Sequence, residues 1–246
     1  MGKRVAVVTG GIGGLGTAIC RSLAQAGRRV IALDLGASNA RIAEFDAAVA
    51  GLDIRFEPLD VTDFDACGTV VRSIEAREGS LDILVNAAGI TRDGTLRKMD
   101  KVQWDAVLGV NLGGVFNLCR HAVDGMATRG FGRIVNISSV NGQTGQFGQT
   151  NYSAAKAGMH GFTMALAREV ARKGVTVNSV SPGYCETALV MAIPDDIRAG
   201  IVAQVPVGRL GKPEEIARTV EFLSADDAGF ITGANIPVNG GLFMSF

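Results

Sequence analysis

The sequence predicts an α/β fold in which helices cover both faces of one parallel sheet. Short apolar runs rich in β-branched residues alternate with stretches of helical composition along all 246 residues. Strands that alternate with helices imply crossover connections and therefore a mainly parallel sheet. The apolar runs are continuous rather than alternating, which is typical of strands covered on both faces. No linker, composition shift or internal repeat divides the chain, so residues 1–246 are expected to form a single domain.

The first part of the chain supplies four of the expected strands. Apolar runs predict strands at residues 4–9 (RVAVVT), 29–34 (RVIALD), 54–59 and 82–86 (DILVN). Stretches of helical composition predict helices at residues 15–26, 40–50, 64–77 and 104–128. Each of the first three helices follows one strand and precedes the next, which is the order that a parallel sheet requires.

The second part of the chain continues the alternation with one less regular stretch. Strands are expected at residues 133–138 (RIVNIS), 175–180 and 234–238, and helices at 153–171 and 213–223. Residues from about 182 to 212 show little pattern and carry Pro194, Pro206 and several charges. Two interpretations stay open for this stretch, a mobile segment at about 184–212 that covers a substrate site or a plain surface connection.

Composition and charge exclude several classes of protein. Lys+Arg and Asp+Glu both number 24 and no basic stripe is present, which disfavours nucleic acid as the main partner. The four cysteines stand apart, without a CxxC or a His/Cys cluster, so no metal site is predicted and reduced thiols in the cytoplasm are expected. The apolar run at residues 4–9 meets a glycine too early for a signal peptide or a membrane span.

A glycine-rich turn lies between the first strand and the first helix. Residues 9–16 read TGGIGGLG, in which Gly11, Gly13 and Gly16 fit GxGxxG, and Gly10, Gly14 and Gly16 fit TGxxxGxG. Glycines here permit a tight turn and the close approach of a pyrophosphate to the helix N-terminus. The pattern therefore predicts a dinucleotide-binding loop, and the alternative is a turn that is only flexible.

The residue type at the end of the second strand bears on the choice of cofactor. Asp34 follows Gly16 by eighteen residues, where a carboxylate can accept hydrogen bonds from the adenosine ribose and would repel a 2′-phosphate. Gly13 leaves the loop without a cation, and both features favour NAD(H) over NADP(H). Arg41 favours the opposite choice, NADP(H), because a mobile arginine can reach the 2′-phosphate. A helix cap is the alternative role of Asp34, and it is compatible with either cofactor.

Two further strand ends are expected to contact the cofactor. Asp60 and Val61 end the third strand, where the adenine should lie, and NAAG from Asn86 to Gly89 ends the fourth. Small residues let a cofactor approach the backbone closely. A structural turn explains the two alanines of NAAG equally well.

Candidate catalytic residues follow the fifth strand and begin the next helix. Tyr152 and Lys156 are four residues apart and share one helix face. A phenol can donate the proton that a ketone needs as hydride arrives, if a nearby cation lowers its pKa. Ser139 lies at the strand end where α/β sheets hold ligands, and its hydroxyl can bond the developing oxyanion. Ser138 is expected to point the other way. Without Ser139, the tyrosine–lysine pair would fit a solvated helix face.

Asn111 lies within a predicted helix, an unfavourable place for asparagine unless its side chain has a partner. Two interpretations stay open. The side chain supports Lys156 through a backbone or water contact, or it makes a structural hydrogen bond in the interior.

These motifs together resemble the short-chain dehydrogenase/reductase family along the whole chain. TGGIGGLG, NAAG, Asn111, Ser139, YSAAK (residues 152–156) and Pro182-Gly183 occur in the order and spacing of that family. The resemblance implies one Rossmann-like, doubly wound domain, an NAD(P) cofactor and a catalytic tetrad of Asn111, Ser139, Tyr152 and Lys156. Thr187 matches a residue expected to contact the nicotinamide carboxamide. Ala87 departs from the family, because many members have a second asparagine there. The expected cofactor contacts are Gly10, Gly13, Gly14, Leu15, Gly16, Asp34, Asp60, Val61, Asn86, Gly89, Tyr152, Lys156, Pro182, Gly183 and Thr187.

A narrower resemblance is to the acetoacetyl-CoA reductases of polyhydroxyalkanoate synthesis. It is carried by residues 90–99 (ITRDGTLRKM), 132–158 (GRIVNISSVNGQTGQFGQTNYSAAKAG) and 181–184 (SPGY). The resemblance implies reduction of acetoacetyl-CoA to (R)-3-hydroxybutyryl-CoA by a homotetramer, with NADPH as the usual cofactor, from which Asp34 departs. It also makes candidates for the acyl-CoA site of Asp93, Lys98, Ser139, Gln146, Phe147, Gln149 and Tyr184. The alternatives are a 3-oxoacyl-acyl-carrier-protein reductase and, more remotely, a dinucleotide-binding sensor without catalysis.

Overall fold

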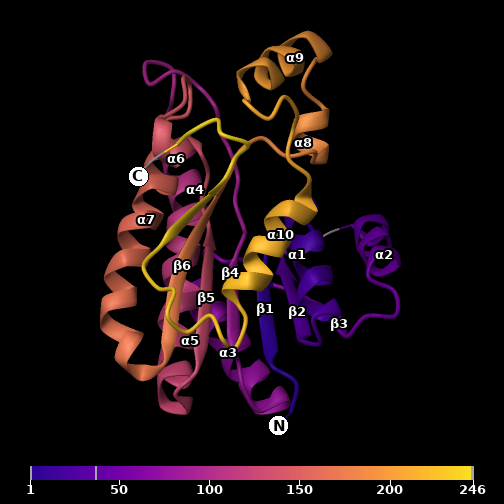
Figure 1. The fold of residues 1–246 in the computed structure, drawn as a ribbon, viewed down its shortest axis with the longest axis vertical. Helices are drawn as coiled ribbons and strands as arrows, with labels where there is room; N and C mark the ends of the chain where they lie inside the picture. Colours follow the sequence, from indigo (N-terminus) through magenta and orange to yellow (C-terminus); the bar gives the residue numbers. More distant parts are fainter. Residues whose placement is uncertain (1, 37, 245–246) are drawn as a thin grey trace.

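A single parallel sheet organises the computed structural model, which describes residues 2–36 and 38–244 (Figure 1). Its seven strands lie in the order β3-β2-β1-β4-β5-β6-β7, and every neighbouring pair is parallel. The strands are β1 (Val5–Thr9), β2 (Arg29–Asp34), β3 (Ile54–Pro58), β4 (Ile83–Asn86), β5 (Gly132–Ile137), β6 (Val175–Pro182) and β7 (Asn235–Val238). The predicted α/β class and all seven predicted strands are confirmed, with small shifts at the strand ends.

Helices lie on both faces of the sheet (Figure 1). The longer ones are α1 (Gly14–Gln25), α2 (Asn39–Ala48), α3 (Phe64–Glu78), α4 (Lys101–Leu108), α5 (Gly114–Arg129), α7 (Thr150–Val170), α9 (Asp195–Gln204) and α10 (Pro213–Leu223). Shorter turns are η1 (Gly109–Gly113), α6 (Asn141–Thr144), η2 (Ala171–Lys173) and α8 (Ala188–Met191). No helix of the described residues is long and apolar enough to cross a membrane.

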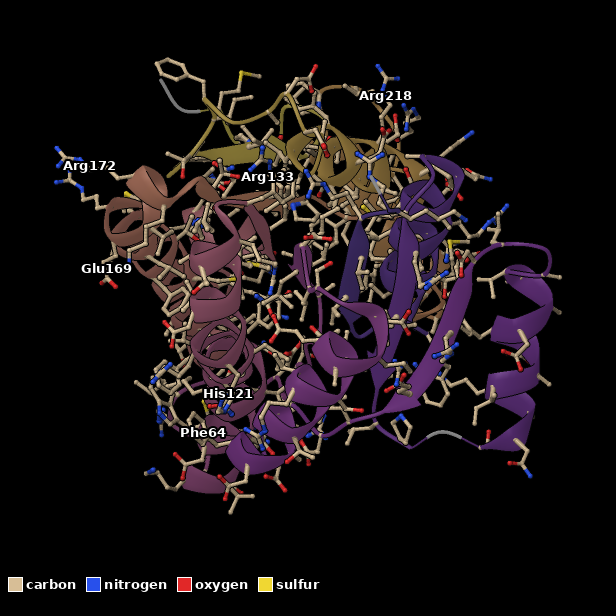
Figure 2. All side chains as sticks on the ribbon, turned by 90° about the horizontal axis from the view of Figure 1, so that it is seen from below. Phe64, His121, Arg133, Glu169, Arg172 and Arg218 are labelled. Atoms are coloured by element: carbon tan, nitrogen blue, oxygen red, sulfur yellow. The ribbon has the colours of Figure 1, made fainter. Side chains whose placement is uncertain are left out.

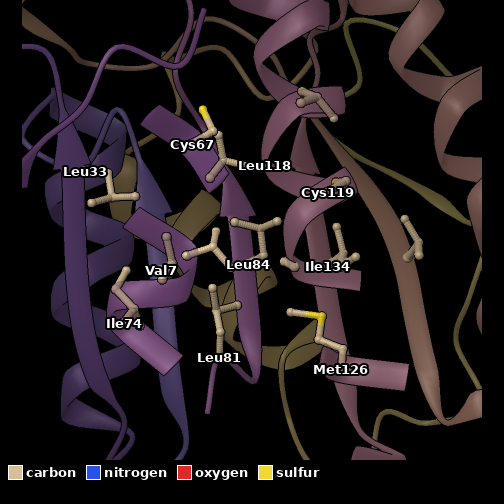
Figure 3. Packing of buried hydrophobic residues seen from close by; sticks show 14 of the residues in the cluster. Val7, Leu33, Cys67, Ile74, Leu81, Leu84, Leu118, Cys119, Met126 and Ile134 are labelled. Atoms are coloured by element: carbon tan, nitrogen blue, oxygen red, sulfur yellow. The ribbon is translucent and has the colours of Figure 1, made fainter. Parts of the chain in front are cut away.

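The two faces of the sheet carry separate apolar cores, because successive strand residues point to opposite sides. Val5 and Val7 of β1 pack with residues of α3, α5 and α7, whereas Ala6 and Val8 pack with residues of α1 and α10. Figure 3 shows part of the first core, in which Leu84 and Ile134 from β4 and β5 lie near Leu118 and Met126 of α5. Both cores are continuous across the central strands, so the strand ends above them are held rigidly.

The order in which the chain adds strands to the sheet reverses after β3. β1 leads outward to β2 and β3, and β4 then pairs with the other edge of β1 before the chain continues to β5, β6 and β7. In open parallel sheets, ligands bind at the carboxyl ends of the strands beside such a reversal. The topology therefore marks the edge formed by the ends of β1, β4 and β5 as the place for a site.

Two sequence expectations need correction. The single helix expected at residues 104–128 is α4 and α5 joined by the π-helical turn η1, which begins and ends in glycine. A Cβ on Gly114, the first residue of α5, would lie 2.7 Å from Val61 Cγ2, so close packing on the turn after β3, which ends at Pro58, requires glycine there. The stretch expected to be irregular contains α8 and α9, which Figure 1 shows at the top of the molecule, on the side of the strand ends.

Candidate active site

The catalytic candidates converge at the carboxyl edge of the sheet. Tyr152 and Lys156 lie one turn apart at the start of α7, and Ser139 follows β5. Asn111 lies in η1, the turn between α4 and α5. Lys156, Ser139 and Asn111 are all buried, and Tyr152 is half-buried. The predicted grouping of the four side chains is therefore present in the structure.

The phenol of Tyr152 has a raised pKa. Burial is the largest cause, and Asp93 and Tyr184 raise the pKa further, whereas the Ser139 hydroxyl lowers it by hydrogen bonding. The sequence led us to expect that Lys156 lowers this pKa. In the structure the ammonium group of Lys156 lies 5.6 Å from the centroid of the Tyr152 ring and donates to the backbone oxygen of Ile137. A raised pKa keeps the phenol protonated, as a proton donor requires.

Lys156 is a buried cation with one hydrogen-bond partner among the described residues. Its Nζ donates to the backbone oxygen of Ile137, the last residue of β5, at 2.7 Å. Burial lowers the pKa of Lys156 from 10.5 to about 8. A lysine ammonium has three hydrogens, so two of them stay free for other partners on this edge. An amphipathic surface lysine would show neither the burial nor this pKa.

The two serines after β5 point in opposite directions, as expected for an extended chain. The Ser139 Oγ faces Tyr152 and accepts a hydrogen bond from the backbone N–H of Asn141 at 3.1 Å. The Ser138 Oγ donates to the backbone oxygen of Lys156 at 2.9 Å. Ser139 therefore faces the site, and Ser138 fixes the helix that carries Tyr152 and Lys156.

Asn111 forms a closed pair of hydrogen bonds with one residue of the chain after β4. Its Oδ1 accepts from the N–H of Ile90 at 2.8 Å, and its Nδ2 donates to the oxygen of Ile90 at 3.0 Å. A Cβ on Gly89 would lie 3.3 Å from Asn111 Oδ1 and 3.5 Å from Lys156 Nζ. The structural hydrogen bond that the sequence allowed is thus present, and it lies beside Lys156.

Two positioning asparagines were not identified from the sequence. Asn151 is fully buried, accepts a hydrogen bond from the N–H of Tyr152, and donates to the oxygen of Arg92 at 3.0 Å. Asn141 donates to Gln149 Oε1 at 2.9 Å while its own N–H holds Ser139. The only signal in the sequence was their place within two residues of a catalytic candidate, and such a place does not distinguish them from loop residues.

The glycine loop between β1 and α1 has a geometry that only glycine tolerates. Gly10 has φ +66°, and a Cβ on Gly16 would lie 2.0 Å from the oxygen of Gly10. No side chain caps the start of α1, and its first turn carries no acidic residue. The Thr9 hydroxyl accepts hydrogen bonds from the N–H groups of Ala87 and Ala88, which joins the ends of β1 and β4. This cradle fits a pyrophosphate at Gly13, Gly14, Leu15 and Gly16, where helix N–H groups are free of side-chain caps.

Asp34 is held at the edge of this loop. Its Oδ2 accepts from the N–H of Ile12 at 3.3 Å, and its Oδ1 accepts from the N–H of Leu35 at 2.9 Å. Arg41 Nη2 lies 3.8 Å from Asp34 Oδ2. The carboxylate of Asp34 therefore stays at the end of β2. The guanidinium of Arg41, the alternative phosphate ligand, lies close to this carboxylate. Ser38, not Asp34, caps α2.

The other expected cofactor residues differ in how exposed their side chains are and in which of their polar groups are free of a partner. Asp60 is exposed and bonds the Thr62 backbone and hydroxyl, and Val61 is buried. Asn86 is buried, and its Nδ2 donates to Asn136 Oδ1 at 2.8 Å, whereas its Oδ1 has no hydrogen-bond partner among the described residues. The Gly183 N–H donates to Val238, and a Cβ on Gly14 would lie 3.2 Å from Thr187 Cγ2. Thr187, four residues after Gly183 in the chain, thus lies over the glycine loop.

The substrate candidates form an inner and an outer group. Gln149 Nε2 donates to Asp93 Oδ2 at 2.9 Å and links this carboxylate to Asn141, and Tyr184 affects the pKa of Tyr152. Gln146, Phe147 and Lys98 are exposed, and Phe147 is 86% exposed. Among the described residues, this inner group is linked to the catalytic candidates through Asn141, which holds Ser139, and through the pKa of Tyr152. The described residues contain no cluster of His, Cys, Asp and Glu that could hold a metal ion.

Comparison with known proteins extends the likeness to nearly the whole chain. A family model described as enoyl-(acyl carrier protein) reductase matches residues 10–243. The chain is 57% identical over 243 residues to an acetoacetyl-CoA reductase of Allochromatium vinosum, which covers 98% of this chain and 99% of the relative. It is 45% identical over 241 residues to the 3-oxoacyl-[acyl-carrier-protein] reductase FabG of Escherichia coli, with 98% of both proteins covered. The crystal structure of gox2181 superposes with a TM-score of 0.91 at 36% identity, over 98% of this chain and 96% of that one.

Proposed function

Because the chain belongs to the short-chain dehydrogenase/reductase family of oxidoreductases acting on C=O and CH–OH groups, we propose that it is an acetoacetyl-CoA reductase. It reduces the 3-keto group of a short acyl-CoA to the (R)-3-hydroxyacyl-CoA. The observation that carries this proposal is the grouping of Tyr152, Ser139 and buried Lys156 beside a glycine loop that fits a dinucleotide. The greater identity to the reductase from Allochromatium vinosum than to FabG supports the choice of substrate.

We propose NAD(H) as the preferred cofactor. The support is Asp34, whose carboxylate is fixed at the end of β2 by two backbone N–H groups. A carboxylate there accepts hydrogen bonds from the ribose and repels a 2′-phosphate. Among the described residues, Arg41 is the cation within salt-bridge distance of Asp34, and there it partly neutralises the carboxylate and is not free to bind a phosphate. NADP(H) is the alternative, and it requires Arg41 to leave Asp34.

The residues have separable roles in the proposed reaction. Bound NADH supplies the hydride. The Ser139 hydroxyl holds the keto oxygen, while the phenol of Tyr152 donates a proton to the same oxygen. Lys156 holds the cofactor ribose with its free N–H groups, and its charge, together with the polar groups around the keto oxygen, stabilises the developing negative charge. Asn111 holds the backbone of Ile90 and thereby the wall beside Lys156.

We propose that the whole of residues 1–246 serves as one NAD(P)-binding domain, with residues 184–212 covering the substrate. Asp93, Gln149 and Tyr184 then line the acyl end of the site, and Lys98, Gln146 and Phe147 lie toward the CoA end. The location of α8 and α9 above the strand ends supports the covering role (Figure 1).

A homotetramer fits the exposed Phe116 on α5 and Met164 on α7, which another copy would bury. Four free, buried cysteines fit the cytoplasm.

The competing function is reduction of the same keto group on an acyl-carrier protein. An acidic carrier would need a basic docking patch near the site. Figure 2 shows Arg172 and Arg218 on widely separated parts of the surface, and Arg129 pairs with Glu75. These three arginines form no joint patch, so they do not support an acidic carrier as the substrate.

The test is reduction of acetoacetyl-CoA by the purified protein with NADH and NADPH in parallel, and with the carrier-protein thioester as a second substrate. We expect the highest kcat/KM for acetoacetyl-CoA with NADH. The Tyr152→Phe variant should lose about 10²- to 10⁴-fold in kcat, the range of a general acid, and still bind NADH. A Tyr152→Phe enzyme of near-normal turnover contradicts the proposed proton donor, and faster reduction of the carrier-protein thioester contradicts the proposed substrate.

A further inference from the structure

A chain of polar side chains runs from the catalytic helix across the last three strands of the sheet. His160 lies one turn beyond Lys156 on α7 and is half-buried. Its Nε2 is 3.2 Å from Ser138 Oγ, and its Nδ1 is 3.2 Å from Ser179 Oγ on β6. Ser179 Oγ in turn lies 3.0 Å from Asn235 Oδ1 on β7. The proposed mechanism assigns no step to any of these four side chains.

Counting hydrogens fixes the direction of the first contact. Ser138 has one hydroxyl hydrogen, and it points to the backbone oxygen of Lys156 at 2.9 Å. The contact between Ser138 Oγ and His160 Nε2 therefore needs its hydrogen from the imidazole. His160 must carry a hydrogen on Nε2 and donate it to Ser138. Ser179 also has one hydroxyl hydrogen, so in a neutral ring Nδ1 accepts that hydrogen in place of Asn235 Oδ1.

This hydrogen-bond direction connects His160 to the backbone at Lys156 and to Ser138, the neighbour of Ser139. The proposed reaction needs Lys156 and Ser139 at a fixed separation. In an α-helix the carbonyl of residue 156 accepts the N–H of residue 160, and Ser138 adds a second hydrogen bond to the same oxygen. Ser138 is covalently next to Ser139. The hydrogen bonds of His160 and Ser138 thus link the turn of α7 that carries Lys156 to the strand end that carries Ser139.

We propose that His160 is a positioning residue, which donates Nε2–H to Ser138 and so holds the Ser138 hydroxyl on the carbonyl of Lys156. The inference rests on the proposed function for its kinetic consequence, since the distance from Ser139 to Tyr152 and Lys156 matters only if these groups react. His160 itself contacts neither substrate nor cofactor in this arrangement.

The electrostatic surroundings agree with a neutral ring. Burial lowers the pKa of His160, and the positive charge of Lys156 lowers it further. A doubly protonated ring would donate from both nitrogens and would add a second positive charge one helical turn from Lys156. A neutral ring with hydrogen on Nε2 donates to Ser138 and accepts from Ser179 without that charge.

The tautomer can be observed without any assay of activity. The chain has two histidines, and the other one, His121, lies at the surface beside Phe64 (Figure 2). In ¹⁵N NMR spectra of the full-length protein, the His121→Gln variant leaves one imidazole, that of His160. We expect the Nε2–H tautomer at neutral pH. An Nδ1–H tautomer or a charged ring at pH 7 overturns the proposal, whether or not the protein reduces acetoacetyl-CoA.

Three substitutions of His160 separate its two nitrogens. The amide nitrogen of glutamine reaches about as far as Nε2, whereas that of asparagine reaches only as far as Nδ1. We therefore expect His160→Gln to keep kcat within about twofold, and His160→Asn and His160→Leu to lower kcat about tenfold, with KM for NADH little changed. Small displacements of reacting groups cost rate of this order or more. Equal kcat values for the three variants, or a fall in kcat that follows thermal stability alone, would overturn the proposal.

A double-mutant cycle tests the path through Ser138. Ser138→Ala should lower kcat about tenfold, and Ser138→Ala with His160→Leu should lower it no further, because both break one hydrogen-bonded path. Multiplicative losses would show that His160 acts by another route. If the wild-type protein fails to turn over acetoacetyl-CoA, the proposed function falls, while the tautomer measurement still decides the role of His160.

Discussion

Replacement of Lys156 by methionine should make the protein more stable while it abolishes turnover. Lys156 is buried, and burial lowers its pKa from 10.5 to about 8. At about 1.36 kcal/mol for each pH unit, the buried charge costs the folded state about 3 kcal/mol near pH 7. Methionine has a similar length without the charge, so the variant avoids this cost.

One lost hydrogen bond offsets part of the gain. Lys156 Nζ donates to the oxygen of Ile137 at 2.7 Å, and methionine cannot replace it. A hydrogen bond of this kind contributes about 1 kcal/mol net, so the expected gain in the free energy of unfolding is about 2 kcal/mol at pH 7. For a chain of this length the melting temperature should rise by about 4–8 °C.

The sign of the pH dependence is specific to this lysine. Below pH 8 the ammonium is charged in both folded and unfolded wild-type protein, so its full cost is present. Between pH 8 and 10.5 the unfolded protein binds more protons than the folded one, and the stability of the wild type rises relative to the variant. Above pH 10.5 the variant should be less stable by about 1 kcal/mol, the value of one hydrogen bond.

The assay is urea unfolding of both proteins at matched concentration, at pH 7 and at pH 10.5. All other titratable groups are shared, so the difference between the two proteins isolates Lys156. Lower stability of Lys156→Met at pH 7, or a difference that stays constant between the two pH values, would refute the reasoning. Lys156→Arg is the matched control, because it keeps the charge and should show no gain.

Three further changes test the cofactor cradle and the wall beside Lys156, and a fourth, Gly161→Ala, is a control in α7. Asp34→Ala should lower kcat/KM with NADH by about tenfold or more, the loss of hydrogen bonds to a charged acceptor, and raise the ratio of NADPH to NADH use; an unchanged ratio in steady-state assays contradicts the role of Asp34. Gly16→Ala places a Cβ 2.0 Å from the oxygen of Gly10 and should weaken NADH binding at least tenfold by fluorescence titration. Gly161→Ala, which meets nothing within 4 Å in α7, should instead stabilise the protein by up to about 1 kcal/mol in thermal unfolding. Asn111→Ala leaves the N–H and C=O of Ile90 without this partner and should cost about 2 kcal/mol of stability by urea titration, with reduced kcat; unchanged stability would show that the two hydrogen bonds contribute little.

The strands and most helices were predictable because their signals are local. β2 and α10 begin and end at the predicted residues, and the other strands shift by one or two residues at either end. The π-turn η1 was not predictable, because it depends on how Gly114 packs on Val61 and how Asn111 bonds Ile90. The helices α8 and α9 lack a strong apolar period, and α9 buries none of its residues, so no pattern revealed them.

The candidate site divides in the same way. Tyr152, Lys156 and the glycine loop have fixed spacing in the sequence, and spacing can be recognised without coordinates. Contacts between distant residues cannot: His160 lies 22 residues from Ser138 and 19 from Ser179. The partner of the Lys156 ammonium was also not predictable, because sequence gives the distance between Cα atoms on a helix face and not the carbonyl to which the ammonium binds.

The catalytic helix is held by two kinds of force along its length. Its later turns bury Ala167 and Val170 in the apolar core, and apolar packing has little preference for orientation. Near the site, the inner face of α7 carries Lys156, His160 and Thr163. Each of these side chains makes a hydrogen bond to a residue at or just after the end of β5. Hydrogen bonds weaken steeply when bent, so they set the angle and register of this turn where packing alone would allow several. The apolar turns supply stability and tolerate the cost of a buried lysine, and the polar turns supply the geometry that proton donation by Tyr152 requires.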